Sequence, residues 1–210
     1  MLIAFEGIDG AGKSTQAQML FRWLKRHGPT VLTSWNSSKL IAPAIKKAKK
    51  QRAFTPTSYA LFHAADFADR HERIILPALI NGETVVCDRY RYTAEARDVV
   101  RGCDPEWVAG LYDFATQPDI VFWIDANPAM AATRKGGKPK YYEAARDIYP
   151  HCDAYEAFDV FQSHVRSRYE EIFRDRNCFQ IDAALPVKEQ QRQIRKIVDY
   201  RRDILDDRAA

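Results

Sequence analysis

The sequence is poor in cysteine, and it has neither a long apolar run nor a strong excess of charge of one sign. Its four cysteines lie far apart and form no Cys-x-x-Cys pair: Cys87, Cys103, Cys152 and Cys178. A zinc site and a disulfide framework are therefore not expected, and a reducing cytoplasm is the compartment that fits. No apolar stretch is long enough to cross a membrane, so no membrane partner is expected. With 32 basic against 28 acidic residues, the net charge of +4 is too small to indicate nucleic-acid binding.

What the chain does have is an alternation of apolar runs and helical patterns across 210 residues, 46% of them hydrophobic. Strands are expected at 2–6, 30–34, 84–88, 120–125 and 178–182. Helices are expected at about 13–26, 40–52, 57–80, 104–116 and 155–175, with a short one after Asn127-Pro128 and a final one from Pro186. Strands that alternate with helices predict an α/β fold, with a parallel sheet covered on both faces. No linker or repeat interrupts the pattern, so one domain is expected over 1–210.

A glycine-rich loop follows the first strand. The segment from Gly7 to Ser14, "GIDGAGKS", fits G-x-x-x-x-G-K-[ST] in full, and a helix follows it. In such a loop successive backbone N–H groups converge on an anion, Lys13 reaches the outer phosphates and the Ser14 hydroxyl binds Mg²⁺. A nucleoside triphosphate with magnesium is therefore expected. The expected nucleotide-binding residues here are Gly7, Asp9, Gly10, Ala11, Gly12, Lys13, Ser14 and Thr15.

The end of the third strand narrows the reaction. No Asn-Lys-x-Asp element is present to read guanine, and the strand does not end in Asp-Glu as in many motor ATPases. It ends in Asp88-Arg89-Tyr90 instead. Asp88 can hold a magnesium-bound water, which makes it the expected metal residue beside Ser14, and Arg89 can bridge two phosphates. These residues favour transfer between phosphates over hydrolysis.

Five segments together resemble the thymidylate kinases: "FEGIDGAGKSTQ", "ALFHAADFADRHERIILPALINGETVVCDRY", "PDIVFWIDANP", "FQSHVRSRYEEI" and "QIDA". The resemblance implies a P-loop kinase fold with five parallel strands, commonly in a homodimer. It also implies transfer of the γ-phosphoryl of ATP to a nucleoside monophosphate, dTMP to dTDP. Asp9 is implied to contact the sugar 3′-hydroxyl of the acceptor. Lys13 and Arg89 would balance charge on the moving phosphoryl group.

A small basic lid is expected at about 134–142, where four cations and two glycines lie between Arg134 and Lys140. Some members of the family carry an arginine in the glycine loop, where this chain has Gly10. Others supply the cation from the lid, and Arg134 and Lys138 are the expected contacts with ATP here. Asp9, Lys13, Arg89 and Arg134 are thus the expected catalytic residues. A mobile segment of this kind can close over ATP and exclude water.

The acceptor-binding positions depart from the family. Where thymidylate kinases typically offer a Phe that stacks on thymine and an Arg that binds it, this chain has His63 and Phe67, with Phe62 and Arg70 nearby. Where they show an aromatic residue followed by Gln, this chain has Arg97 and Asp98. The expected acceptor-binding residues are Asp9, Phe62, His63, Phe67, Arg70, Arg89 and Arg97. His63 and Phe67 have the alternative of packing in the core.

Three functions follow from these observations. The first is a kinase of dTMP, and the second is the same kinase chemistry on a different or modified nucleotide. The third is a nucleotide-binding ATPase that transfers nothing, against which the complete set of Lys13, Ser14, Asp88 and Arg89 argues.

Overall fold

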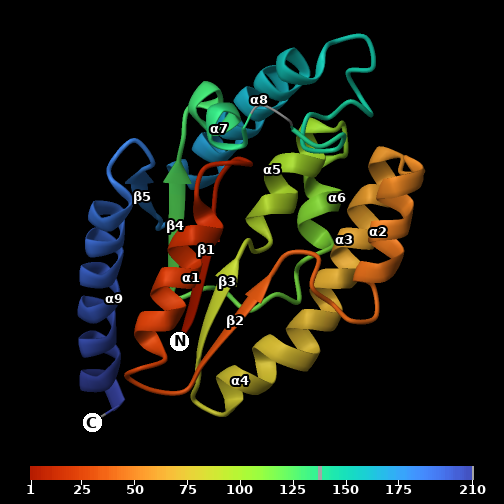
Figure 1. Ribbon diagram of the computed structural model, residues 1–210. Helices are drawn as coiled ribbons and strands as arrows, with labels where there is room; N and C mark the ends of the chain where they lie inside the picture. The colour runs from red at the N-terminus through yellow and green to blue at the C-terminus, as the bar shows by residue number, and fades with distance from the viewer. Residues whose placement is uncertain (137–138, 210) are drawn as a thin grey trace.

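A computed structural model describes residues 1–136 and 139–209 of the chain. Its described strands form one parallel sheet in the order β2-β3-β1-β4-β5 (Figure 1). Their bounds are β1 (Leu2–Glu6), β2 (Thr30–Ser34), β3 (Thr84–Asp88), β4 (Ile120–Asp125) and β5 (Phe179–Asp182). The expected α/β fold with five parallel strands is confirmed. β1 is buried throughout, and its first four residues are apolar, as expected of a strand covered on both faces.

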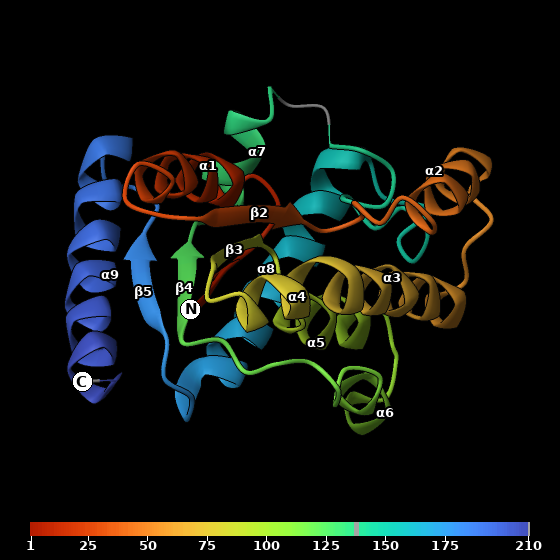
Figure 2. The same ribbon diagram turned by 90° about the horizontal axis from the view of Figure 1, so that it is seen from below.

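Helices cover both faces of this sheet (Figure 2). On one face lie α1 (Lys13–Leu24) and α9 (Val187–Ala209), which pack against each other, α1 also against β3 and α9 against β5. On the other face lie α3 (Pro56–Arg70), a π-helical segment η1 (His71–Ile75), α4 (Leu76–Ile80), α5 (Tyr92–Val100) and α8 (Ala154–Arg174). Beyond the sheet lie α2 (Ala42–Gln51), α6 (Pro105–Gly110) and α7 (Pro128–Arg134). None of the described helices is long and apolar enough to span a membrane.

Capping side chains fix where several helices begin. Asp104 accepts a hydrogen bond from the backbone N–H of Trp107 at 2.8 Å, and Asn127 accepts one from Ala129 at 2.8 Å. Each cap is followed by a proline in the first turn, where its missing N–H costs nothing. These two helix starts were readable from the sequence, and both are confirmed.

The sequence-based expectation missed α5 altogether. This helix buries Thr93, Glu95, Arg97 and Asp98 together with its apolar residues. A helix whose buried face is polar has no amphipathic pattern for a sequence reading to detect. The expected helix over 104–116 is also shorter than predicted, since α6 ends at Gly110.

The register of the sheet sets the location of the site. β1 and β3 are neighbours, with Phe5 paired to Asp88, so both strands end at the same edge. The backbone N–H of Arg89 continues the ladder by donating to Phe5 O at 2.9 Å. The glycine loop after β1 and the Asp88-Arg89 turn after β3 therefore leave the sheet side by side. In open α/β sheets ligands bind at this carboxyl edge.

Candidate active site

The glycine loop has a backbone that only glycine accommodates easily at three positions. Gly7, Gly10 and Gly12 have φ values of 136°, 87° and 103°. A Cβ at Gly10 would lie 2.6 Å from the carbonyl oxygen of Ala131 in α7, and one at Gly7 would collide with Ile124 O. The loop therefore folds tightly against β4 and α7 and directs its backbone toward a cavity of about 420 Å³. Loop residues line that cavity together with Arg89, Arg134, Lys135 and Glu143.

Lys13, the first residue of α1, is only 4% exposed. Its Nζ donates to the carbonyl oxygen of Ile8 at 2.5 Å. Burial, assisted by the nearby Arg89 guanidinium, lowers the pKa of Lys13 to about 7. A phosphate beside this ammonium group would supply the negative charge that favours its protonated form.

Arg89 is held in a left-handed conformation, with φ of 75°, which is uncommon outside glycine. Its Nη1 donates to Gly7 O at 3.1 Å and to Thr93 Oγ1 at 3.2 Å, and its Nη2 donates to Asp9 Oδ1. The guanidinium is therefore fixed beside the glycine loop. A cation held this way needs little reorganisation to stabilise charge that develops beside it.

Asp9 is the point where several elements meet. Its Oδ2 lies 3.6 Å from Arg97 Nη2 and accepts from Gln162 Nε2 at 3.3 Å, while its backbone N–H donates to Gln162 Oε1 at 3.0 Å. Burial alone would raise the pKa of Asp9, but Arg97, Arg89 and Lys13 hold it well below its usual value. Asp9 is thus a carboxylate already held in place by two guanidinium groups and an amide.

Gln162 also ties this carboxylate to the segment after α7, because its Nε2 donates to Glu143 O at 2.8 Å. Glu143 in turn pairs with Lys135 and accepts from the backbone N–H of Lys140 at 3.1 Å. Gln162 itself is fully buried in α8. One side chain therefore connects the glycine loop to the expected lid.

Glu6 lies beneath the site at the end of β1 and is fully buried. Its Oε1 accepts from the backbone N–H groups of Tyr90 at 2.8 Å and Thr93 at 3.2 Å. Its Oε2 accepts from Thr93 Oγ1 at 2.6 Å and Tyr169 OH at 2.9 Å. Burial raises the pKa of Glu6 to about 7 despite these donors. By accepting from the backbone of Tyr90 and Thr93, the carboxyl group fixes the turn that carries Arg89.

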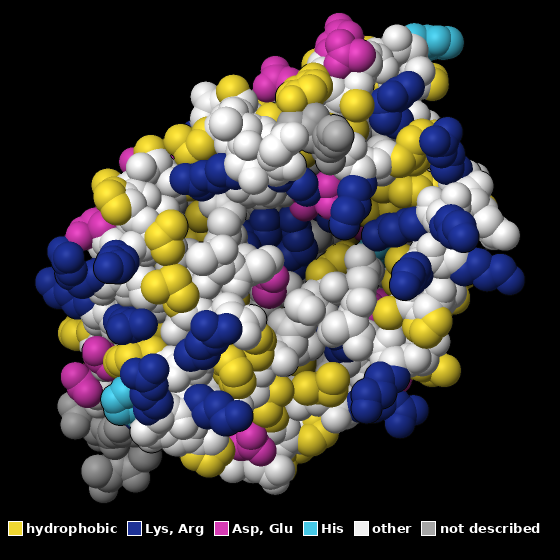
Figure 3. Space-filling model, in the orientation of Figure 1, with side chains coloured by type: hydrophobic (Ala, Val, Ile, Leu, Met, Phe, Trp, Pro, Cys, Tyr) yellow, Lys and Arg dark blue, Asp and Glu magenta, His cyan; other side chains and the backbone are white. Residues whose placement is uncertain are grey.

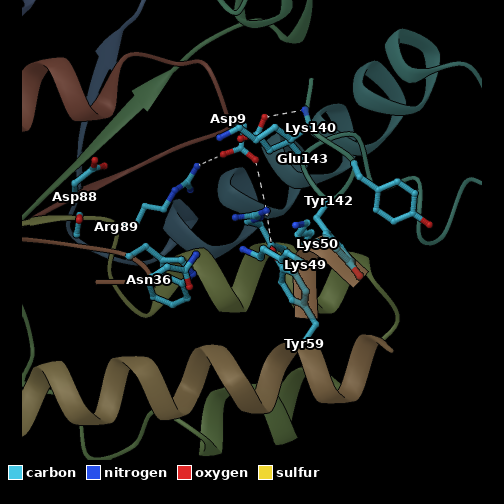
Figure 4. Close-up of a pocket in the computed structure, with 14 residues that line it drawn as sticks. Asp9, Asn36, Lys49, Lys50, Tyr59, Asp88, Arg89, Lys140, Tyr142 and Glu143 are labelled. Atoms are coloured by element: carbon cyan, nitrogen blue, oxygen red, sulfur yellow. Dashed lines mark hydrogen bonds and ion pairs between the residues drawn. The ribbon is translucent and has the colours of Figure 1, made fainter. Parts of the chain in front are cut away.

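A second cavity, of about 530 Å³, adjoins the first. Its lining residues are Asp9, Ser34, Trp35, Asn36, Lys49, Lys50, Tyr59, Asp88, Arg89, Arg97, Lys140, Tyr141, Tyr142 and Glu143 (Figure 4). Three residues, Asp9, Arg89 and Glu143, line both cavities. The molecule is hollowed near its middle, and Lys and Arg side chains rim the hollow and lie inside it (Figure 3). Two anionic ligands could therefore meet at these three residues.

The donor set fits a magnesium ion bound largely through phosphate and water. Asp88 Oδ1 is buried and has no hydrogen-bond partner, and Ser14 lies in the glycine-loop cavity. Among the described residues no group of three or more His, Cys, Asp or Glu side chains could hold a metal alone. Mg²⁺ commonly uses one or two protein oxygens with substrate phosphates rather than a full protein cage.

The structure brings together most of the residues expected to bind nucleotide. Asp9, Lys13, Ser14, Thr15, Arg89 and Arg134 share the first cavity with Gly10 and Gly12, and Arg97 joins Asp9 and Arg89 in the second. Gly7 and Ala11 contact this group through their carbonyl oxygens, which accept from Arg89 and Arg134 respectively. Lys138 lies outside the described residues.

Four expected acceptor-binding residues lie away from the cavity lining. Phe67 is fully buried against Tyr90 and Tyr112, with ring centroids 4.9 Å and 5.2 Å away. Arg70 is fully buried as well, and its Nε donates to Asp66 Oδ2 at 3.0 Å. Phe62 is partly exposed and packs on Phe54. His63 is buried behind the cavity wall. Phe67 and Arg70 point into the core because the face of α3 that carries them packs toward the sheet.

Sequence reasoning missed other residues of this region: Trp35, Lys49, Tyr59, Glu143 and Gln162. Tyr59 lies on α3 one turn before His63, and Lys49 comes from α2, within a run of basic residues over 46–52. Their burial was the missing information, because Tyr59 is 2% exposed and only the fold shows which lysine of the run turns inward. No motif marked Gln162.

Comparisons with known proteins agree with this geometry. A sequence profile of the thymidylate kinase family matches residues 5–194. The chain is 46% identical over 202 residues to the probable thymidylate kinase 2 of Saccharolobus solfataricus, covering 94% of this chain and 95% of that protein. It is 39% identical over 135 residues to the probable thymidylate kinase of Thermococcus kodakarensis, covering 60% and 66% of the two chains.

The fold also matches a crystal structure of thymidylate kinase from Ehrlichia chaffeensis, with a TM-score of 0.73 and 23% identity over 94% of this chain and 98% of that one. The family uses ATP as phosphate donor and a nucleoside monophosphate as acceptor. The chain belongs to the thymidylate kinase family.

Proposed function

We propose that this chain transfers the γ-phosphoryl group of ATP to dTMP, giving dTDP and ADP, with ATP in the glycine-loop cavity and dTMP in the adjoining one. The observation that carries this arrangement is the junction of the two cavities at Asp9, Arg89 and Glu143. A donor and an acceptor in these cavities would present their phosphates to each other across that junction. Such positioning supplies much of the catalysis in phosphoryl transfer.

The reaction needs no covalent intermediate on the protein. An oxygen of the acceptor phosphate attacks the γ-phosphorus in line, and the bond from γ-phosphorus to the bridging oxygen of ADP breaks. Lys13 and Arg89 stabilise the charge on the transferred group, since both are buried cations at the glycine loop. Asp9 accepts from the sugar 3′-hydroxyl, a role for which its lowered pKa keeps it ionised.

We propose Mg²⁺ as the metal of this site, where it would neutralise charge on the donor phosphates. Ser14 lies in the glycine-loop cavity, and Asp88, which lines the adjoining cavity, has a buried carboxylate oxygen without a hydrogen-bond partner. The support is the chemistry of these two oxygen donors, which suits a hard divalent cation.

Residues 134–142 act as a lid in this proposal, within a single kinase unit over 1–210. Arg134 donates from Nη1 to Ala11 O at 3.2 Å and from Nη2 to Ala183 O at 2.7 Å, which holds its guanidinium on the glycine-loop cavity. A cation there can contact ATP without an arginine in the loop itself. Closure over ATP would exclude water and suppress hydrolysis.

We also propose that two copies of the chain pair through the outer face of α3 and α4. Leu61, Phe62, Leu76 and Ile80 are between 37% and 76% exposed along this helical run. Apolar groups gathered on one face are typical of protein interfaces. Sedimentation of the wild type and of Ile80→Asp tests this: the wild type should be a dimer and the variant a monomer. A monomeric wild type would refute the pairing.

The function is tested by supplying ATP and Mg²⁺ with a panel of nucleoside monophosphates and following ADP and the nucleoside diphosphate directly. We expect dTMP to give the highest kcat/KM and ADP release to depend on the acceptor. Preference for another monophosphate would move the assignment to a different acceptor. ADP release that is equal with and without acceptor would refute phosphotransfer.

A further inference from the structure

No arginine of α3 lines the acceptor cavity, because Arg70 is fully buried and paired with Asp66. A pyrimidine with ring carbonyl groups nevertheless needs hydrogen-bond donors when water is removed from it. The question is which buried donor of this cavity is free to supply them. The answer depends on the proposed function, since it concerns the same acceptor site.

The two ends of the cavity can be told apart. Asp9 and Arg89 mark the end shared with the ATP cavity, where the acceptor phosphate and sugar belong. From Asp9 a chain of contacts leads away from that end: Arg97 Nη2 lies 3.6 Å from Asp9 and donates to the Tyr59 hydroxyl at 3.1 Å. Lys49 Nζ lies 5.3 Å from the centre of the Tyr59 ring. The base therefore belongs at the end that holds Tyr59 and Lys49.

Lys49 is held there by His63. The Nδ1 of His63 lies 2.6 Å from Tyr59 O, so this nitrogen carries the proton and donates to the carbonyl group. The other nitrogen, Nε2, is then an acceptor, and it lies 3.3 Å from Lys49 Nζ. Burial, together with Lys49, keeps the pKa of His63 well below its usual value, so the ring stays neutral and able to accept.

The ammonium group of Lys49 retains unused donors. An ammonium has three N–H groups, and His63 accepts one of them. Within the described part of the chain, no ion pair joins Lys49 to a carboxylate. Trp35 and Tyr59 add flat aromatic faces to the same wall. An inward donor beside aromatic faces is the combination that a planar base with carbonyl oxygens would fill.

We propose that Lys49 donates a hydrogen bond to the O4 carbonyl oxygen of the acceptor thymine, that His63 positions it, and that this contact selects thymine over cytosine. Thymine presents the O4 acceptor where cytosine presents the N4 amino donor. The partly buried ammonium group of Lys49, facing that amino group, would have a second donor in place of an acceptor. Sites built to hydrogen-bond one group reject the analogue that lacks it.

The test is steady-state kinetics of Lys49→Met with dTMP and dCMP as acceptors at saturating ATP. We expect the KM for dTMP to rise about 10- to 100-fold, with kcat within about threefold of the wild type. The ratio of kcat/KM for dTMP over dCMP should fall at least about tenfold, while the KM for ATP stays unchanged. Lys47→Met is the matched control, because Lys47 lies on the same helix, is exposed and lines neither cavity; its kinetics should equal those of the wild type.

Lys49→Arg separates donation from packing, because it keeps donors at the position and should retain the preference for dTMP. An equal loss of kcat/KM for dTMP and dCMP in Lys49→Met would overturn the proposal and assign Lys49 to the phosphate. Unchanged selectivity would overturn it too. If Lys49→Met does not fold, loss of the dTMP preference in Lys49→Arg decides against the proposal. If the wild-type enzyme does not phosphorylate dTMP, the proposed function itself is refuted, so the two failures are distinguishable.

Discussion

The two cavities of this molecule are built by different means. The glycine-loop cavity comes mainly from one continuous segment, residues 7–15, and presents backbone atoms together with Lys13. The acceptor cavity is assembled from side chains of the β2 end, α2, α3, the β3 end, α5 and the segment after α7. A backbone cradle recognises any polyphosphate and changes little with sequence. A wall of side chains can be altered one residue at a time.

The largest expected effect is at the two buried cations of the glycine-loop cavity. Lys13→Ala and Arg89→Ala should each lower kcat by about 10³-fold, because each removes a buried cation from the transferred phosphoryl group. Circular dichroism should show both variants folded. Arg22→Ala, an exposed cation of α1, is the control and should keep wild-type turnover. Turnover near the wild-type value in Lys13→Ala or Arg89→Ala would mean that the substituted cation does not carry the chemistry.

Glu6, buried at the end of β1 beneath the two cavities, should make the free energy of unfolding depend on pH. Its folded pKa of about 7 lies above the ordinary 4.5 because burial disfavours the charged form. The stability it contributes is therefore full below about pH 4.5 and is lost as pH rises through about 7. This amounts to about 3 kcal/mol of unfolding free energy.

Urea denaturation between pH 4.5 and 8 measures this effect. The wild type should lose stability with rising pH relative to Glu6→Gln, and Glu72→Gln, at an exposed site, should follow the wild type. Equal pH dependence in the wild type and Glu6→Gln would show that Glu6 does not titrate in this range.

A substitution at Gln162 tests whether binding in the acceptor cavity depends on the segment after α7. Gln162→Leu removes the hydrogen bonds that join Asp9 to Glu143 O while nearly preserving volume. We expect the KM for dTMP to rise about tenfold, since Asp9 is no longer held toward the acceptor, with a smaller change in the KM for ATP. Ser167→Ala, exposed on the same helix, should leave both constants unchanged. A rise confined to the KM for ATP would contradict the link to the acceptor.

The smallest effect is expected at Phe67, for which the sequence left both the acceptor site and the core open and which the structure places in the core. Phe67→Leu should lower the unfolding free energy by about 1–2 kcal/mol through lost packing against Tyr90 and Tyr112. The KM for dTMP should stay within about twofold. A large change in that KM without loss of stability would instead assign Phe67 to the acceptor site.

The contrast between the cavities also explains what could be read from the sequence. The strands and the glycine loop follow from local patterns, so 2–6, 30–34, 84–88 and 120–125 were located to the residue. The identity of the side chains that line the acceptor cavity depends on which faces of α2 and α3 turn toward it. Tertiary packing decides this. Tyr59 and Lys49 therefore escaped notice, while Phe67, aligned by position, fell in the core. Nothing local distinguishes Gln162 from any other glutamine on a long helix.

The close approach of Gly10 to α7 restricts how this enzyme can change over evolution. Any larger residue there would strike the carbonyl group of Ala131, and the φ of 87° would strain it further. The loop cannot acquire its own arginine unless α7 moves aside, and α7 carries Arg134 at its C-terminal end. An arginine at position 10 and the present position of α7 thus exclude each other, so replacing Gly10 would require two segments to be rebuilt at once.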